Sequence, residues 1–116
     1  MTGDGSVGLN FAEFETAVRH KLPIVVVINN DQAWGMVKHE QELRGAKILA
    51  SELGLVRYDL AAEGFGVYAE LVEDARQIGP ALERAFASGR PACLNVMVDT
   101  KPPSPVTQAA VAAGAP

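Results

Sequence analysis

Two short polar segments contain the residue types that could do chemistry. Gly3-Asp4-Gly5-Ser6-Val7-Gly8 matches the pattern G-x-G-x-x-G, and Asn29-Asn30-Asp31 follows further along the chain. Glycines at this spacing let a backbone approach a phosphate closely, and an acidic residue after the next strand is what a dinucleotide-binding fold uses for a ribose. The pattern therefore permits a dinucleotide site, which would make the chain a fragment of an oxidoreductase.

Asp4 favours a metal-bridged diphosphate over a dinucleotide. Its carboxylate lies between the two leading glycines, where it would repel a pyrophosphate, and the expected helix begins only at Asn10, beyond the glycine motif. A Mg²⁺ ion between Asp4 and the diphosphate removes the repulsion, but it needs a second oxygen donor from the end of the adjacent strand. The segment Asn29-Asn30-Asp31 supplies that donor.

The two segments together resemble the diphosphate-binding motif of thiamine-diphosphate enzymes, which pairs G-D-G with N-N. The chain resembles the C-terminal cofactor-binding domain of acetolactate synthase and its relatives. This resemblance continues through residues 30–37, 79–85, 89–92 and 96–99. It implies a thiamine-diphosphate-binding fold with thiamine diphosphate and Mg²⁺ as cofactors. It also implies a parent reaction in which a 2-oxo acid is decarboxylated and then ligated to a second carbonyl compound.

The resemblance implies a set of metal ligands in one of two registers. Counting 27 positions from Asp4 reaches Asp31, so the ungapped alignment makes these two side chains ligands of Mg²⁺ and Ala33 a ligand through its backbone carbonyl. With a one-residue deletion, Asn30 would be the side-chain ligand and Gln32 the carbonyl. We adopt the ungapped register as the prediction.

The same resemblance implies contacts with thiamine diphosphate itself. Gly5 and Ser6 can present backbone N–H groups and a hydroxyl to the diphosphate. No catalytic residue is assigned, because the resembling enzymes take the glutamate that helps deprotonate the thiamine ring from a different domain of a different subunit. The predicted cofactor-binding residues are Gly3, Asp4, Gly5, Ser6, Asn30, Gly35 and Met36.

The elements that must position these residues alternate between helix and strand. This alternation predicts an α/β fold, a partial doubly wound parallel sheet with flanking helices. Its first strand is expected to be missing, because Met1-Thr2 immediately precedes the G-D-G. The run at residues 24–28 is almost purely β-branched, which suits a strand buried on both faces. The expected helices cover residues 10–22, 42–55, 59–63 and 80–88, and the expected strands cover residues 24–28, 67–72 and 92–98.

Length and composition limit the chain to one hydrophobic core. It has 116 residues, of which 48% are hydrophobic and 21% charged, and a chain of this size cannot hold two separate cores. We expect residues 1–105 to be the C-terminal part of a cofactor-binding domain. Residues 106–116, rich in alanine and without periodicity, are expected to form a flexible tail.

Charge and composition exclude several classes of partner. The net charge of −4 argues against nucleic acid, and no apolar run is long enough for a membrane. The N-terminus carries no signal pattern, which predicts a cytoplasmic protein. Cys93 is expected to be buried, His20 and His39 to be solvated, and Trp34 to pack.

The sequence therefore predicts the thiamine diphosphate and Mg²⁺ binding portion of an acetolactate-synthase-like decarboxylase and carboligase, inactive alone. A 2-oxo acid is the small-molecule partner of the parent enzyme. A second copy, or a complementary chain, is expected to supply the other cofactor-binding domain. Two alternatives stay open: a dinucleotide-binding oxidoreductase fragment of the Rossmann type, and a non-catalytic remnant or interaction module without a ligand.

Overall fold

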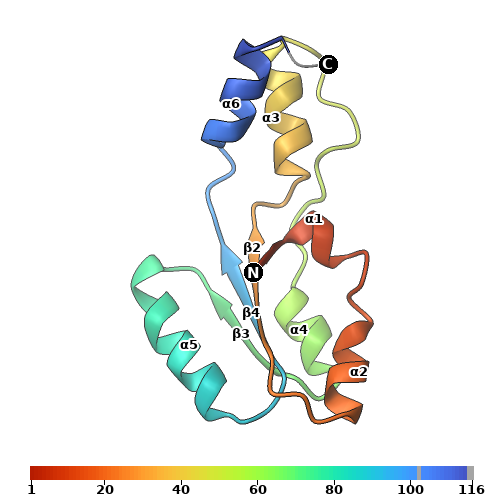
Figure 1. Ribbon diagram of the computed structural model, residues 1–116, viewed down its shortest axis with the longest axis vertical. Coiled ribbons are helices and arrows are strands. Elements are labelled where there is room, and N and C mark those ends of the chain that lie inside the picture. The colour runs from red at the N-terminus through yellow and green to blue at the C-terminus, as the bar shows by residue number, and fades with distance from the viewer. Residues whose placement is uncertain (102, 115–116) are drawn as a thin grey trace.

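A parallel sheet with helices on both faces forms the body of the protein (Figure 1). The computed structural model describes residues 1–101 and 103–114. Its elements, in chain order, are β1 (Thr2–Gly3), α1 (Asp4–Val7), α2 (Glu13–Arg19), β2 (Val25–Asn30), α3 (Gly35–Leu43), α4 (Tyr58–Glu63), β3 (Tyr68–Val72), the 3-10 helix η1 (Ala75–Gln77), α5 (Ile78–Ala87), β4 (Ala92–Met97) and α6 (Pro105–Ala112).

The four strands lie in the order β1-β2-β4-β3, and all neighbours are parallel. From β2 the chain crosses past β4 to β3 with α4 packed against the sheet, and it returns from β3 to β4 through α5. Because parallel crossovers are right-handed, this reversal of direction places α5 on the face opposite α4, as Figure 1 shows. The predicted fold class, a doubly wound parallel sheet with flanking helices, is confirmed.

The strand at the centre of the core is β4 rather than β2. All of β4 except its last residue is buried, because it pairs along its length with both β2 and β3. In β2 only Ile28 and Asn30 are buried, and Ile24, just before the strand, is 45% exposed. The prediction that this run is buried on both faces is therefore wrong for its first half, because β1 pairs only with the end of β2.

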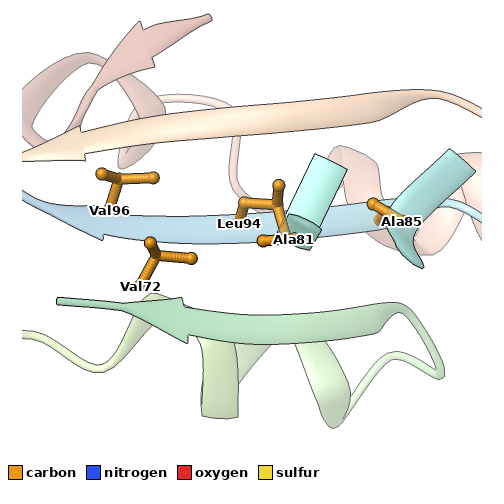
Figure 2. Packing of buried hydrophobic residues seen from close by; sticks show 6 residues of the cluster. Val72, Ala81, Ala85, Leu94 and Val96 are labelled. Atoms are coloured by element: carbon orange, nitrogen blue, oxygen red, sulfur yellow. The ribbon is translucent and has the colours of Figure 1, made fainter. Parts of the chain in front are cut away.

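Each face of the sheet has its own apolar cluster. On one face the small side chains of α5, Ala81 and Ala85, let that helix lie close against β4, where it covers Leu94 (Figure 2). On the other face a second cluster joins α2 and α4 to β2 and β4. The buried members are Val72, Ala81, Ala85, Ala92, Leu94 and Val96 on the α5 face, and Phe14, Ile28, Ala62, Val67 and Cys93 on the other.

Helices α3 and α6 pack against each other beyond the carboxyl ends of the strands (Figure 1). The radius of gyration is 15.9 Å and the longest axis is 46 Å, whereas about 13 Å is expected for a compact domain of this size. The projecting helix pair explains the difference.

The expected helix at residues 42–55 is wrong. Helix α3 covers the preceding residues instead and ends at Leu43, because Gly45 adopts a left-handed conformation (φ 65°) that terminates it. Ala50 and Gly54 also have positive φ, so the apolar residues of this segment do not form one helical face. Leu49, within the range of the expected helix, is 62% exposed.

The start of the helix expected at residues 10–22 also differs from the prediction. Helix α2 begins at Glu13, and Asn10 does not cap it with its side chain. The Asn10 backbone carbonyl accepts the N–H of Glu13 instead. A separate short helix, α1, begins at Asp4 inside the glycine motif, so the argument that no helix begins there is wrong.

Both ends of the chain form regular structure that the sequence did not predict. Thr2 and Gly3 pair with Ile28 and Asn29, so β1 represents the strand expected to be missing. Within the expected flexible tail lies α6, begun by Ser104, whose side chain accepts the Thr107 N–H. The mobility of this segment stays a prediction, and residues 115–116 lie outside the described residues.

We predict that Leu94→Ala lowers the free energy of unfolding by about 2–5 kcal/mol, because it opens a cavity in the α5 face of the core. Leu49→Ala is the matched control, and it should change stability by less than about 0.5 kcal/mol because Leu49 is exposed. Urea denaturation followed by circular dichroism measures both. Equal losses in the two variants would contradict this description of the core.

Candidate functional site

Two carboxylates meet at the edge of the sheet where β1 and β2 end. Asp4 directly follows β1, and Asp31 directly follows β2. Since Gly3 pairs with Asn29 in a parallel ladder, the chain leaves both strands at the same edge. The joint position predicted for the two aspartates is therefore the one that the fold produces.

Asp4 is 2% exposed, and its two carboxylate oxygens have different surroundings. Oδ1 accepts the N–H of Gly5 at 2.9 Å. Oδ2 is the one buried side-chain oxygen or nitrogen of residues 1–101 and 103–114 that has no hydrogen-bond partner. Burial raises the pKa of Asp4 and the neighbouring Asp31 carboxylate raises it further, against an opposing contribution from the Gly5 N–H. This oxygen is suited to a cation, which would satisfy it and offset the repulsion between the two carboxylates.

The loop after β2 has an unusual backbone that several hydrogen bonds hold in place. Gln32 has a φ of 62°, a left-handed conformation that is uncommon outside glycine. The Asp31 side chain accepts the Ala33 N–H at 3.2 Å. From across the loop, the Ser51 carbonyl accepts the Trp34 N–H at 2.8 Å, and Ala33 forms an antiparallel bridge with Glu52. Strain of this kind is typical of ligand-binding loops.

A cleft of about 500 Å³ opens at this edge of the sheet, between the two strand ends and the start of α3. It is large enough for part of a cofactor, and it lies outside the carboxyl ends of parallel strands, where ligands of open α/β sheets bind. The residues that line it are Gly3, Asp4, Gly5, Ser6, Asn29, Asp31, Ala33, Trp34, Gly35, Met36, Val37 and Val98.

Two glycines of the cleft allow close approaches that a larger residue would prevent. A Cβ on Gly5 would lie 2.8 Å from the Trp34 ring, so the indole packs directly on the glycine loop. A Cβ on Gly35 would collide with the Asp31 carboxylate. Trp34 thus packs, as predicted, and at 37% exposure it also lines the cleft.

The structure brings all but one of the predicted site residues to this cleft. The exception is Asn30, which is fully buried. Its Nδ2 donates to the carbonyl of Val56 and to Oδ1 of Asn95, and its Oδ1 accepts the Gln32 N–H. The prediction that Asn30 binds the cofactor is not supported by this geometry, because its side chain is buried, does not line the cleft and bonds to other groups of the protein. The same geometry favours Asp31 over Asn30 as the side-chain ligand.

The cleft also contains residues that the sequence did not single out. Asn29, Val37 and Val98 line the cleft, although none of them is among the predicted site residues. Alternation along β2 could have indicated that Asn29 faces away from Asn30. Nothing in the sequence connects Val98 to the site, because it arrives from β4 at the far end of the chain.

The other titratable candidates lie elsewhere. His20 is exposed, as predicted, but His39 is 6% exposed and its Nε2 lies 2.7 Å from the Thr100 carbonyl, so the prediction that it is solvated is wrong. Cys93 is buried, as predicted, and burial raises its pKa to about 12. Among the described residues, no three histidine, cysteine or acidic side chains form a group that could hold a metal. A cation in this cleft would need further ligands from the protein backbone and from a small molecule bound together with it.

None of the helices that the structure describes is both long and apolar enough to cross a membrane.

Comparisons with known proteins point to one family. A family model described as thiamine pyrophosphate enzyme, C-terminal TPP binding domain, matches residues 1–96. The acetolactate synthase large subunit IlvG of Mycobacterium tuberculosis is 43% identical over 100 residues, which cover 85% of this chain and 18% of that protein. The putative thiamine pyrophosphate-containing protein YdaP of Bacillus subtilis is 36% identical over 105 residues, covering 90% of this chain and 18% of that protein.

Solved structures show the same fold. Benzoylformate decarboxylase from Polynucleobacter necessarius superimposes with a TM-score of 0.78 at 19% identity, covering 85% of this chain and 19% of that one. The 4-hydroxybenzoylformate decarboxylase of Rhodococcus jostii RHA1, described as thiamine diphosphate-dependent, superimposes with a TM-score of 0.77 at 24% identity. The match covers 84% of this chain and 19% of that one. The chain thus spans 18% of the length of the two curated relatives and 19% of these two structures.

We predict that Asp4→Asn stabilises the metal-free protein at pH 7. Because the pKa of Asp4 is raised above 3.8 on folding, the folded state holds this proton more tightly than the unfolded chain. The free energy of unfolding therefore falls as the pH rises from about 3.8 through the raised pKa, and stays lower above it. An amide removes this loss and still accepts the Gly5 N–H.

Urea denaturation in EDTA at pH 4 and pH 7 measures the effect, which should be larger at pH 7. Asp99→Asn, at an exposed aspartate, is the matched control and should change little. A less stable Asp4→Asn protein at pH 7 would show that Asp4 is satisfied without a cation.

Proposed function

Since this chain belongs to the family of C-terminal thiamine pyrophosphate-binding domains of thiamine pyrophosphate enzymes, we propose that its cleft binds the diphosphate of that cofactor through Mg²⁺. Asp4 and Asp31 would bind the ion through their carboxylates, and Ala33 through its backbone carbonyl. The ion would supply the positive charge that offsets the repulsion between these carboxylates and the diphosphate.

The observation that carries this proposal is the unpartnered, buried Oδ2 of Asp4 beside a second carboxylate. Two carboxylates and a carbonyl are hard oxygen ligands, which suit Mg²⁺ better than a transition metal. The small number of protein ligands also fits, because Mg²⁺ is usually bound through one or two carboxylates together with substrate phosphates.

The backbone around the two aspartates would hold the diphosphate. Gly3, Gly5 and Ser6 form one wall of the cleft, with small side chains that let phosphate oxygens approach the main chain. Gly35 and Met36 begin α3, and the first N–H groups of a helix have no acceptor within it. These groups would donate to the diphosphate from the opposite wall.

Bound thiamine diphosphate supplies an electron sink for decarboxylating a 2-oxo acid and for the carboligation that follows. The part of this chain is to bind and orient the diphosphate end. A second domain, supplied by another copy or by a complementary chain, would contribute the glutamate that helps to deprotonate the thiamine ring. We propose an acetolactate-synthase-like reaction for the complete enzyme on the basis of the relatives' names.

We predict that thiamine diphosphate binds the ¹⁵N-labelled chain only when Mg²⁺ is present. Titration should shift the amide signals of Gly5, Ser6 and Asp31, and EDTA should reverse the shifts. NADH, with or without Mg²⁺, should leave these signals unchanged. Shifts with NADH in EDTA would instead support the dinucleotide alternative, and no shifts with either compound would support a module without a ligand.

Gly35→Ala and Gly8→Ala form a matched pair for the same titration. A Cβ on Gly35 would displace the Asp31 carboxylate, so we expect a loss of Mg²⁺ affinity of about tenfold or more. A Cβ on Gly8 meets only ordinary contacts, with its nearest atom, the Gly5 carbonyl oxygen, at 3.5 Å. Equal affinities in the two variants would argue against Asp31 as a ligand.

We also predict that the chain alone forms no acetolactate from pyruvate with Mg²⁺ and thiamine diphosphate, because the catalytic glutamate belongs to another domain. A colorimetric acetolactate assay with the purified chain measures this. Product formation above a reaction lacking protein would contradict the proposed division of the site.

A further inference from the structure

We propose that Asn30, Asn95 and Asp59 form a hydrogen-bonded relay that positions the loop of residues 31–34. The relay would hold the two loop residues that carry metal ligands without touching the metal or the cofactor. The inference rests on the proposed function, because it assigns a purpose to the position of Asp31 and Ala33. In this relay Asn30 is a positioning residue rather than the cofactor-binding residue that its sequence position suggested.

The relay consists of three hydrogen bonds in series. Asn95 Nδ2 donates to Asp59 Oδ1 at 2.9 Å, and Asn30 Nδ2 donates to Asn95 Oδ1 at 3.0 Å. Asn30 Oδ1 then accepts the backbone N–H of Gln32 at 3.1 Å. The three side chains come from α4, β4 and β2, so they connect a helix on one face of the sheet to the loop at its edge.

The carboxylate at one end fixes the direction of every bond in the relay. An ionised carboxylate can only accept, so Asn95 must turn its NH₂ group toward Asp59 and its oxygen toward Asn30. Asn30 must then turn its own NH₂ group toward Asn95, which leaves its oxygen facing the loop. The Val56 carbonyl accepts from Nδ2 of both asparagines, at 3.0 and 3.4 Å, and favours the same orientation.

Asp59 is held in the ionised form that this direction requires. Burial by itself would raise its pKa, but hydrogen bonds from Arg57 and Asn95 hold the pKa below its usual range. Two guanidinium nitrogens of Arg57 donate to the carboxylate, Nη2 at 2.5 Å. Arg57 thus secures the end of the relay nearest to solvent.

The loop needs such support because its backbone is strained. At Gln32, where φ is 62°, the N–H is the group that Asn30 accepts. On the other side of the loop, the Gln32 carbonyl accepts the Leu53 N–H at 2.8 Å. Gln32 is therefore held at both its N–H and its carbonyl, which fixes the residue between Asp31 and Ala33.

Burying the three polar side chains of the relay costs desolvation free energy, which good packing alone would not require. Asn30 and Asn95 are fully buried and Asp59 is 4% exposed. Apolar side chains of similar size would avoid the desolvation of these groups, so a fully satisfied polar series favours one specific arrangement over general stability.

The test uses Asn95→Leu in the full chain, with two readouts. In the metal-free protein, amide hydrogen exchange at Gln32 should become about tenfold faster, because Asn30 loses the partner that orients it. With thiamine diphosphate present, the Mg²⁺ dissociation constant should rise about tenfold. Asp59→Asn keeps the shape of the side chain and should move both readouts in the same direction by less, which covers the case in which Asn95→Leu does not fold.

Leu94→Ala is the control, because it weakens the opposite face of β4 and leaves the relay intact. It should lower global stability without changing exchange at Gln32 or the Mg²⁺ dissociation constant. A relay variant that left Gln32 exchange unchanged would overturn the proposal, as would faster exchange with unaltered Mg²⁺ binding. If the wild-type chain shows no Mg²⁺-dependent binding, the proposed function fails, and the metal-free exchange result alone decides whether the relay positions the loop.

Discussion

The parallel pairing of β1 with β2 is the constraint on which the rest of this structure depends. Because Gly3 pairs with Asn29, the chain leaves both strands at one edge of the sheet and brings Asp4 and Asp31 together there. Two neighbouring carboxylates, one of them buried with an unpartnered oxygen, repel each other, and each accepts only one backbone N–H in return. The site is therefore a local cost in free energy that the remainder of the fold must offset, and that a bound cation would relieve.

The destabilising site and the apolar clusters that offset it lie in different parts of the fold. The two apolar clusters lie along the middle of the sheet, under α5 on one face and under α2 and α4 on the other, whereas the polar groups gather where the strands end. The free energy of unfolding of a domain is only about 5–15 kcal/mol. The destabilisation from the strained Gln32 and the desolvated Asp4 must therefore be offset by well-packed strands. The start of α3 lines the cleft, and the projecting pair α3 and α6 contributes no residue to either apolar cluster.

The sequence predicted best the elements whose pattern is local and strong. The strands at residues 67–72 and 92–98 and the helices at residues 59–63 and 80–88 agree with the structure to within about two residues, as expected for boundaries. The helix at residues 42–55 failed although its leucines had suitable spacing. The backbone around residues 51–54 instead pairs with the loop after β2, through Ser51 to Trp34 and through Gln32 to Leu53. Such long-range hydrogen bonds override local helix propensity, and no window of sequence contains both partners.

The sequence by itself determined the family, because its Gly3-Asp4-Gly5 and Asn29-Asn30-Asp31 segments, at this spacing, resemble the diphosphate-binding motif of that family. It could not decide which of three adjacent residues, Asn29, Asn30 or Asp31, faces the cleft. Which residue faces the cleft depends on where β2 ends. Side chains alternate across a strand, so a shift of one residue moves each side chain to the opposite face. The tertiary structure decided it by burying Asn30 against Asn95, a partner 65 residues further along the chain, which leaves Asn29 and Asp31 at the cleft.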